Sequence, residues 1–407
     1  MIKLFFILVV PFLLYAENLE ELINLALHNK KIDSSLQNLQ SVEKAYESTK
    51  NGYLPSVTVG ATYTDVEHET AGSPNNSTNE YASVSYSLYD GGKKGLTYES
   101  YETKIKSEKQ NIAYIKNQVS LDVIEHYYNY LTYKSQKIAK EKEIEQLQAQ
   151  FKRLERFFDA GTTTSDELDK IVSRVQSATV DLQELELQIQ TVLHKLEYIS
   201  GKNVSIDEGS IVKNFIGDIQ LRKDIEVLKY NRDELLTQAK IVDTKTNPQL
   251  SLENKYTHYD NNYDNKLYES DFDEQNVLMV NLSWKIFDFN STKKAYESAY
   301  KSYLSLKSNY EYEKNRADVD LKLAKKSLEI GNLKIKSAQA GLKAANTTYD
   351  FAKAKYENGL IDNIAFLEAL TEKFTAISVL EKAKYDLEIK KANVIFHSGK
   401  NLEEFIQ

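Results

Sequence analysis

Cysteine is absent from this chain of 407 residues, and proline and glycine are scarce, with 4 and 14 occurrences. The lack of cysteine excludes disulfide bonds, thiol catalysis and attachment of lipid through a cysteine. Because proline removes a backbone donor and clashes with the preceding helical turn, its scarcity favours long uninterrupted helices. Stability must then come from packing and assembly without covalent cross-links.

Long hydrophobic runs are missing beyond the N-terminus. Charged residues make up 28% of the chain and the mean hydropathy is -0.52, so no later stretch offers the about eighteen apolar residues of a membrane-spanning helix. Residues 1–16 combine Lys3, an apolar run and Ala16, which predicts a secretory signal peptide. A buried N-terminal strand or helix is the alternative. Export without disulfides is typical of a bacterial envelope protein.

Sequence motifs of catalytic, metal-binding and phosphate-binding sites are also lacking. The six histidines are scattered, and neither an HExxH motif nor a phosphate-binding glycine loop occurs. We therefore expect no catalytic residue, no metal site and no cofactor, and predict that the chain is not an enzyme. The formal net charge of -8 argues against nucleic acid as a partner, since phosphate binding needs a basic face.

What the chain does contain is a repeat of itself. Asp90 and Asp288 are separated by the same 198 residues as Gly161 and Gly359, and the tetrapeptide SGKN recurs at that spacing. One register held over so many residues indicates two structural repeats. We place them at 17–203 and 218–407, joined by a linker at 204–217.

Each repeat is expected to run helix, β-hairpin, very long helix, glycine turn and return helix. The leading helices are predicted at Leu19–Lys50 and Ile219–Lys245, and the hairpins at about 55–90 and 248–288. The long helices, about Lys94–Phe158 and Ser291–Tyr356, would each be on the order of 100 Å in length. Apolar residues of the first return segment recur at alternating spacings of three and four residues, which is the heptad pattern of a coiled coil.

The predicted strands alternate apolar and polar residues, as in the wall of an outer-membrane barrel. Four strands cannot close a barrel, because the smallest closed barrels need about eight. Either several chains share one barrel or the hairpins form a soluble sheet packed on a core. In the first case the lipid-facing residues would be Val84, Tyr86, Leu88, Leu278, Val280, Leu282, Trp284 and Ile286.

This order of elements, together with GYLPSVTVGATYT and the F-x-x-G tips at Gly161 and Gly359, resembles the TolC-like outer membrane efflux protein family. The resemblance covers essentially the whole chain after the signal peptide. It implies a mainly α fold with a small β part. Three protomers would build one transmembrane β-barrel, with four strands from each chain, continuous with a long α-helical coiled-coil barrel.

The resemblance also implies a function and its partners. The chain would be a homotrimeric outer membrane channel with a long periplasmic portion, serving as the exit duct of a tripartite efflux or type I secretion system. Its partners would be a periplasmic adaptor (membrane fusion protein), an inner-membrane transporter and outer membrane lipid. A structural or adhesive coiled-coil envelope protein without a pore is the alternative from another class, and a periplasmic adaptor is a further one.

By the same resemblance, the tip turns would contact the adaptor. The candidate contact residues are Phe158, Ala160, Gly161, Thr162, Tyr356, Gly359, Leu360 and Ile361. Acidic residues at the second tip would form a periplasmic gate. Glu368 matches one acidic position of the family, the other is Ala365, and Asp362 lies nearby.

The residues alone give a simpler role for the tips. A glycine readily adopts the left-handed conformation that ends a helix. Thr164, Ser165 or Asp166 would then cap the next helix through its side chain.

Overall fold

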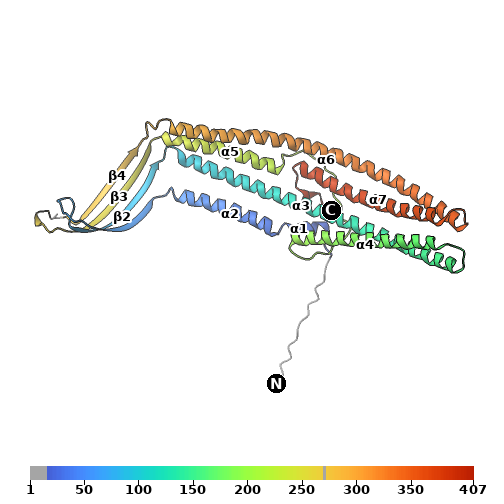
Figure 1. Ribbon diagram of the computed structural model, residues 1–407. Helices are drawn as coiled ribbons and strands as arrows, with labels where there is room; N and C mark the ends of the chain where they lie inside the picture. The colour runs from blue at the N-terminus through green and yellow to red at the C-terminus, as the bar shows by residue number, and fades with distance from the viewer. Residues whose placement is uncertain (1–15, 269–271) are drawn as a thin grey trace, which may run out of the picture. The chain divides into compact units, whose positions relative to one another are not determined.

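The computed structural model describes residues 16–268 and 272–407. The predicted signal peptide lies outside the described residues except for Ala16. Two runs of elements in the same order follow a short first helix, α1 (Leu19–Ala26), which confirms the predicted internal repeat (Figure 1). The first run is α2 (Lys30–Asn51), β1 (Ser56–Asp65), β2 (Asn76–Tyr89), α3 (Lys93–Asp159) and α4 (Ser165–Ser200). The second is α5 (Lys223–Asp243), β3 (Gln249–Asn262), β4 (Glu274–Ser283), α6 (Ser291–Glu357) and α7 (Asn363–His397).

The long helices match their predicted bounds closely, whereas the leading helices do not. The helix predicted at Leu19–Lys50 is two helices, because the side chain of Asn29 accepts a hydrogen bond from the Ile32 amide (3.0 Å) and starts a new helix there. The second leading helix begins at Lys223 instead of Ile219. Its preceding backbone is engaged elsewhere, as the Gln220 amide donates to the Ser398 carbonyl at 2.9 Å.

The four strands form one antiparallel sheet in the order β1-β2-β3-β4, so the two hairpins lie side by side. Cross-strand pairing sets Val57 opposite Val84, Val84 opposite Asn254 and Asn254 opposite Leu278. Within the described residues β1 and β4 are the edges of this sheet.

Sequence reasoning extended the last strand too far. Trp284 and Ile286, predicted as strand residues, follow the end of β4 at Ser283. The final pair of the ladder is Gln249 with Ser283, and the next partner for β4 would be Pro248, which has no amide hydrogen to donate. The indole nitrogen of Trp284 donates instead to the Thr246 carbonyl at 3.0 Å.

By its contacts the chain divides into two compact units, and each unit combines parts of both repeats. One holds Ile112–Lys223, Lys314–Gln407 and the N-terminal residues up to Ser34, and the other holds Ser35–Asn111 and Asp224–Glu313. The boundaries fall inside α2, α3 and α6 and at the start of α5. No helix in the described ranges is long and apolar enough to cross a bilayer.

The larger hydrophobic core of the first unit joins α1, α3, α4, α7 and the segment 204–217, which we predicted as a linker. Ile206 and Val212 of this segment are buried, and the hydroxyls of Tyr127 and Tyr128 donate to its carbonyls at Asp207 and Ser210 (2.8 and 3.0 Å). The segment is therefore an ordered part of the core.

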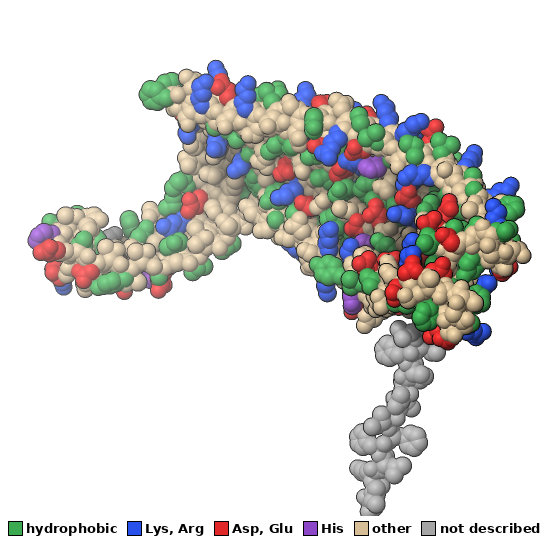
Figure 2. Space-filling model, turned by 45° about the vertical axis from the view of Figure 1, so that its right-hand side comes forward, with side chains coloured by type: hydrophobic (Ala, Val, Ile, Leu, Met, Phe, Trp, Pro, Cys, Tyr) green, Lys and Arg blue, Asp and Glu red, His purple; other side chains and the backbone are tan. Residues whose placement is uncertain are grey.

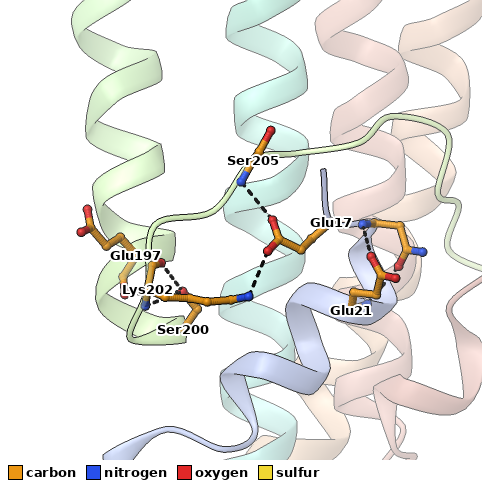
Figure 3. Close-up of polar contacts among 7 residues, drawn as sticks. Glu17, Glu21, Glu197, Ser200, Lys202 and Ser205 are labelled. Carbon is orange, nitrogen blue, oxygen red and sulfur yellow. Dashed lines mark hydrogen bonds and ion pairs between the residues drawn. The ribbon is translucent and has the colours of Figure 1, made fainter. Parts of the chain in front are cut away.

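Glu17 ties this segment to the start of the chain (Figure 3). Its carboxylate accepts a hydrogen bond from the Ser205 amide at 3.0 Å and pairs with Lys202 at 3.1 Å. The backbone of Glu17 makes two hydrogen bonds to the same segment. Its amide donates to the Ser205 carbonyl (2.7 Å), and its carbonyl accepts from the Asp207 amide (2.9 Å). The Glu17 side chain is only 14% exposed, whereas the Lys202 side chain is 51% exposed, so water reaches the ion pair from the lysine side.

Candidate functional site

The first tip turn joins α3 to α4 through Gly161. This glycine has φ 72°, and the Thr162 amide donates to the Phe157 carbonyl (2.8 Å) while the Gly161 amide donates to Phe158 (2.9 Å). These two bonds form a Schellman motif, which satisfies carbonyls that the helix end leaves free.

The second tip repeats this geometry. Gly359 has φ 71°, and the amides of Leu360 and Gly359 donate to Lys355 (2.8 Å) and Tyr356 (3.0 Å). The predicted left-handed glycine is thus confirmed at both tips.

The two tips differ in how the next helix starts. Asp362 caps α7, since its carboxylate accepts a hydrogen bond from the Ala365 amide at 2.9 Å. Thr164 occupies the cap position of α4, but its side chain makes no capping bond and donates to the Asp166 carboxylate instead. The predicted side-chain cap by Thr164, Ser165 or Asp166 is therefore wrong, and only the second tip has one.

A hydrophobic cluster lies behind both tips. It contains Leu147, Leu154, Ile171, Ala178, Tyr349, Phe366, Leu367 and Leu370. Beside it the rings of Tyr356 and Phe366 stack with centroids 4.9 Å apart, and the Arg153 guanidinium lies over the Tyr356 ring at 5.0 Å. These contacts join the end of α3 to α6 and α7, so the two tips are packed into one body.

Buried polar residues of α3 were missed by the sequence reasoning. The Gln150 amide donates to the Tyr356 hydroxyl and to the Asn363 side chain (3.0 Å), and Asn363 is only 2% exposed. Glu143 is also buried and pairs with Lys140 at 2.7 Å. A signal existed, because Glu143 and Gln150 alternate with Leu147 and Leu154 at spacings of four and three, which are core positions of a heptad.

The predicted adaptor-contact residues divide by exposure. Phe158, Ala160, Gly161, Thr162, Gly359 and Leu360 are exposed, and Leu360 reaches 72%. Tyr356 and Ile361 are half-buried and pack against the cluster behind the tips. These two side chains support the tip, whereas Phe158 and Leu360 are the apolar side chains available to a partner.

The predicted gate residues both belong to the second tip, with Asp362 at the N-cap of α7 and Glu368 in the second turn of this helix. Asp362 and Glu368 are both exposed, as is Ala365. The carboxylate of Asp362 is already engaged in capping α7. Glu372 is exposed four residues beyond Glu368 on the same side of α7, and its helical spacing was a signal that our sequence reasoning did not use.

Grooves run between the helices at a distance from the tip turns. One of about 490 Å³ is lined by Lys140, Glu143, Asp181, Gln188, Phe374 and Lys382. Another of about 590 Å³ lies between α6 and α7. Charged side chains of both signs are interspersed over the helices on the face that Figure 2 shows. Within the described ranges, no group of three or more acidic, histidine or cysteine side chains is placed to hold a metal ion.

The sheet presents an apolar face that the chain itself does not cover. All residues of β4 are exposed, including the predicted Leu278, Val280 and Leu282. Val84 and Leu88 of β2 are also exposed, while Tyr86 is half-buried. The opposite face carries polar residues such as Ser83, which pairs with Lys255. This pattern disagrees with a soluble sheet packed on a core.

The comparison with known families decides to which class of protein the chain belongs. The sequence matches the Outer membrane efflux protein family at residues 22–202 and 219–400, which is most of the chain. The chain belongs to this family. Membership confirms the predicted resemblance, the outer membrane location with its long periplasmic part, and the prediction of an efflux channel that is not an enzyme. It favours the channel over a structural or adhesive coiled coil without a pore.

Solved structures share the fold of this family member at low sequence identity. A membrane protein from Pseudomonas aeruginosa aligns with TM-score 0.83 and 15% identity, covering 95% of this chain and 91% of that one. The Campylobacter jejuni CmeC outer membrane channel gives 0.82 and 18%, with coverage of 94% and 86%. The outer membrane protein VceC from Vibrio cholerae gives 0.81 and 13%, with coverage of 94% and 96%. Among curated protein sequences none matches significantly. The predicted fold class is confirmed.

Proposed function

We propose that three copies of this chain form one channel, with a shared barrel of twelve strands continued by a helical duct. The observation that carries this proposal is the open four-stranded sheet, whose apolar face and two edge strands have no partner within the described part of the chain. In lipid an unpaired edge leaves backbone groups without hydrogen bonds. Pairing β4 of one copy with β1 of the next removes every edge.

The helices support the same assembly. On α4 the exposed apolar residues Val180 and Leu187 are seven residues apart, as are Leu323 and Ile330 on α6. Residues at this spacing share one side of a helix and form the seam of a coiled coil. A neighbouring copy would cover these seams.

Cross-linking tests the assembly, because the chain has no cysteine of its own. We expect a variant with one cysteine in β1 and one in β4 to give covalent dimers and trimers in the outer membrane. The purified protein should conduct ions in planar bilayers. The control carries cysteines at Ser83 and Lys255, which face each other across β2 and β3 and should cross-link only within a chain. A monomeric, non-conducting protein would contradict the proposal.

We further propose that the tips dock to a periplasmic adaptor, which connects the channel to an inner-membrane transporter. Support comes from exposed apolar side chains at Phe158 and Leu360 on a rigidly packed base. A photo-reactive amino acid at position 158 or 360 should cross-link to the adaptor in cells, and one at the 89% exposed Tyr198 should not. Equal cross-linking at all three positions would contradict docking at the tips.

The acidic residues of the second tip are proposed as the gate of this channel, closed at rest. In a trimer Glu368 would be present three times, and gathered carboxylates bind cations. Glu368→Ala should weaken the block of conductance by divalent cations, while Glu357→Ala, an exposed acid before the turn, should not. Unchanged block in Glu368→Ala would remove this residue from the gate.

A further inference from the structure

The tetrapeptide SGKN forms the turn after α4 and, 198 residues later, the turn after α7. The backbone is the same in both turns, since Gly201 and Gly399 have φ values of 77° and 79°. Their surroundings differ. Gly399 is buried, and an added Cβ would come within 2.6 Å of the Gln220 carbonyl oxygen. The first turn, which includes Lys202 in Figure 3, is exposed and has open space at Gly201.

An asparagine of α3 holds the second turn in place. The side-chain amide of Asn117 donates to the Lys400 carbonyl at 2.7 Å, and its side-chain oxygen accepts a hydrogen bond from the Leu402 amide at 2.9 Å. Asn117 is only 6% exposed and Leu402 is fully buried, so loss of the asparagine would leave a buried amide without a partner. This pair of bonds, the asparagine clamp, joins the first repeat to the end of the second.

The parts of the asparagine clamp occur twice in the sequence. The repeat distance of 198 carries Asn117 to Asn315, the turn at 398–401 to the turn at 200–203, and Leu402 to Val204. Asn315 is exposed on α6, and its side chain makes no hydrogen bond to any residue in the described ranges. The Val204 amide likewise has no acceptor among the described residues. One chain therefore carries a second set of clamp parts without joining them.

A closed ring of repeats would join these parts between copies. Three chains in a ring alternate first and second repeats, and each repeat contacts its neighbours on both sides. Within the chain, α3 of the first repeat packs against α7 of the second, for example through Gln150 and Asn363 (3.0 Å). The equivalent contact between chains then lies between α6 of one copy and α4 of the next.

The exposed apolar residues of α4 fit this arrangement. Val172 and Tyr198 are 36% and 89% exposed, whereas their counterparts in α7, Leu370 and Phe396, are 1% and 9% exposed. The chain itself covers these α7 residues with α3, whose Tyr114 ring has its centroid 6.3 Å from that of Phe396. We expect α6 of a neighbouring copy to cover the equivalent residues of α4.

We propose that Asn315 of each copy binds the turn at 200–203 of the next copy, donating to the Lys202 carbonyl and accepting from the Val204 amide. The Lys202 carbonyl already accepts the Ser200 hydroxyl at 2.9 Å, but a carbonyl oxygen has two lone pairs and can accept a second hydrogen bond. The partner is a second copy of this chain, and the proposal rests on the trimer of the proposed function. It assigns the first SGKN turn to a subunit contact.

Cysteine cross-linking tests this contact directly, because the chain has no cysteine. The variant with Asn315→Cys and Asn203→Cys should give covalent dimers and trimers in the outer membrane when treated with a short bifunctional maleimide. The control combines Asn315→Cys with Asn401→Cys, the exposed equivalent position in the second turn, and should not join copies. The variant with cysteines in β1 and β4 is cross-linked in parallel.

The outcomes separate the clamp between copies from the trimer. Cross-linking through the strands without cross-linking between positions 315 and 203 would overturn the clamp and leave the trimer intact. Equal cross-linking of the control pair would also overturn the clamp, because the contact would then not be specific to the first turn. Loss of both the strand and the clamp cross-links would overturn the two proposals together.

Asn315→Ala tests whether the contact stabilises the assembly. Its trimer should dissociate at a lower temperature on gels than the wild type, because three clamps are lost at once. Alanine has a higher helix propensity than asparagine, so α6 itself should not be weakened. Asn332→Ala is the control, since this exposed side chain donates to its own helix at the Leu328 carbonyl (3.2 Å). Unchanged dissociation of Asn315→Ala, or an equal loss in both variants, would overturn the proposal.

Discussion

Glu125 on α3 illustrates, at the scale of single residues, how the core affects ionisation. Burial raises the pKa of its carboxyl; a hydrogen bond from Asn393 lowers the pKa, and the nearby Asp122 raises it. Because the folded protein favours the protonated form, this carboxyl contributes stability below its unfolded pKa. That contribution is lost as the pH rises through the raised folded value.

Glu125→Gln should therefore raise the stability of the protein at pH 7 relative to the wild type and leave it unchanged at pH 4. The gain should be less than about 1.4 kcal/mol, the free energy of a one-unit pKa shift, since the carboxylate is half-buried and partly solvated. Urea unfolding at the two pH values measures it, with the exposed Glu155→Gln as control. An equal effect at both pH values would rule out ionisation as the cause.

At the scale of elements, the geometry of the two tip turns follows from how a helix ends, independently of any docking partner. Gly161 and Gly359 hold the left-handed position of a Schellman motif, and each directs the chain from one long helix into the next. The heptads around them place apolar residues in the cluster behind the tips. The turn is therefore explained without any partner.

Gly161→Ala should open the first tip, because the left-handed conformation costs a residue with a Cβ about 1–2 kcal/mol. The amide of Thr162, which donates to Phe157, should then exchange with solvent roughly 5 to 30 times faster. Gly341→Ala is the control: this glycine lies inside α6 with open space around it, so alanine should stabilise the helix. Hydrogen exchange mass spectrometry measures both, and unaltered exchange at Thr162 would contradict the motif.

At the scale of the whole molecule, the apolar and polar faces of the sheet must each meet a surrounding of the same polarity. Its two faces differ along β4, where Leu282 lies on the apolar side and Asn281 on the polar side. A packed core covers neither face. In the proposed trimer, lipid covers the apolar face of the sheet, and the neighbouring copies pair with the two edge strands.

Leu282→Arg should impair assembly in the outer membrane, with a cost of roughly 2 to 4 kcal/mol per chain near the bilayer midplane and less near the interface. The adjacent Asn281→Arg should assemble normally, since its side chain would face the lumen. Heat resistance of the trimer on gels after membrane extraction gives the comparison. If both variants assembled normally, the apolar face would not be in contact with lipid.

The sequence by itself determined the repeat, the long helices to within a residue or two, and the glycine tips. It could do so because helix and strand periods and left-handed glycines are local properties of the chain. It was less accurate where backbone groups bond to distant segments, as at Gln220 and Ser398 or at the end of β4 opposite Pro248. It also missed Gln150 and Asn363. The heptad spacing of Gln150 indicates a core position, but its bond to Asn363 is set by tertiary structure.

Tertiary structure alone decided the order of the strands, the burial of the segment 204–217 and the exposure of the apolar residues between β4 and α6. It also separated Tyr356 and Ile361, which pack behind the tips, from Phe158 and Leu360, which remain available to a partner. The physical reason is common to all of these. Burial and pairing are settled between residues far apart in the chain, whereas a sequence pattern reports only on neighbours.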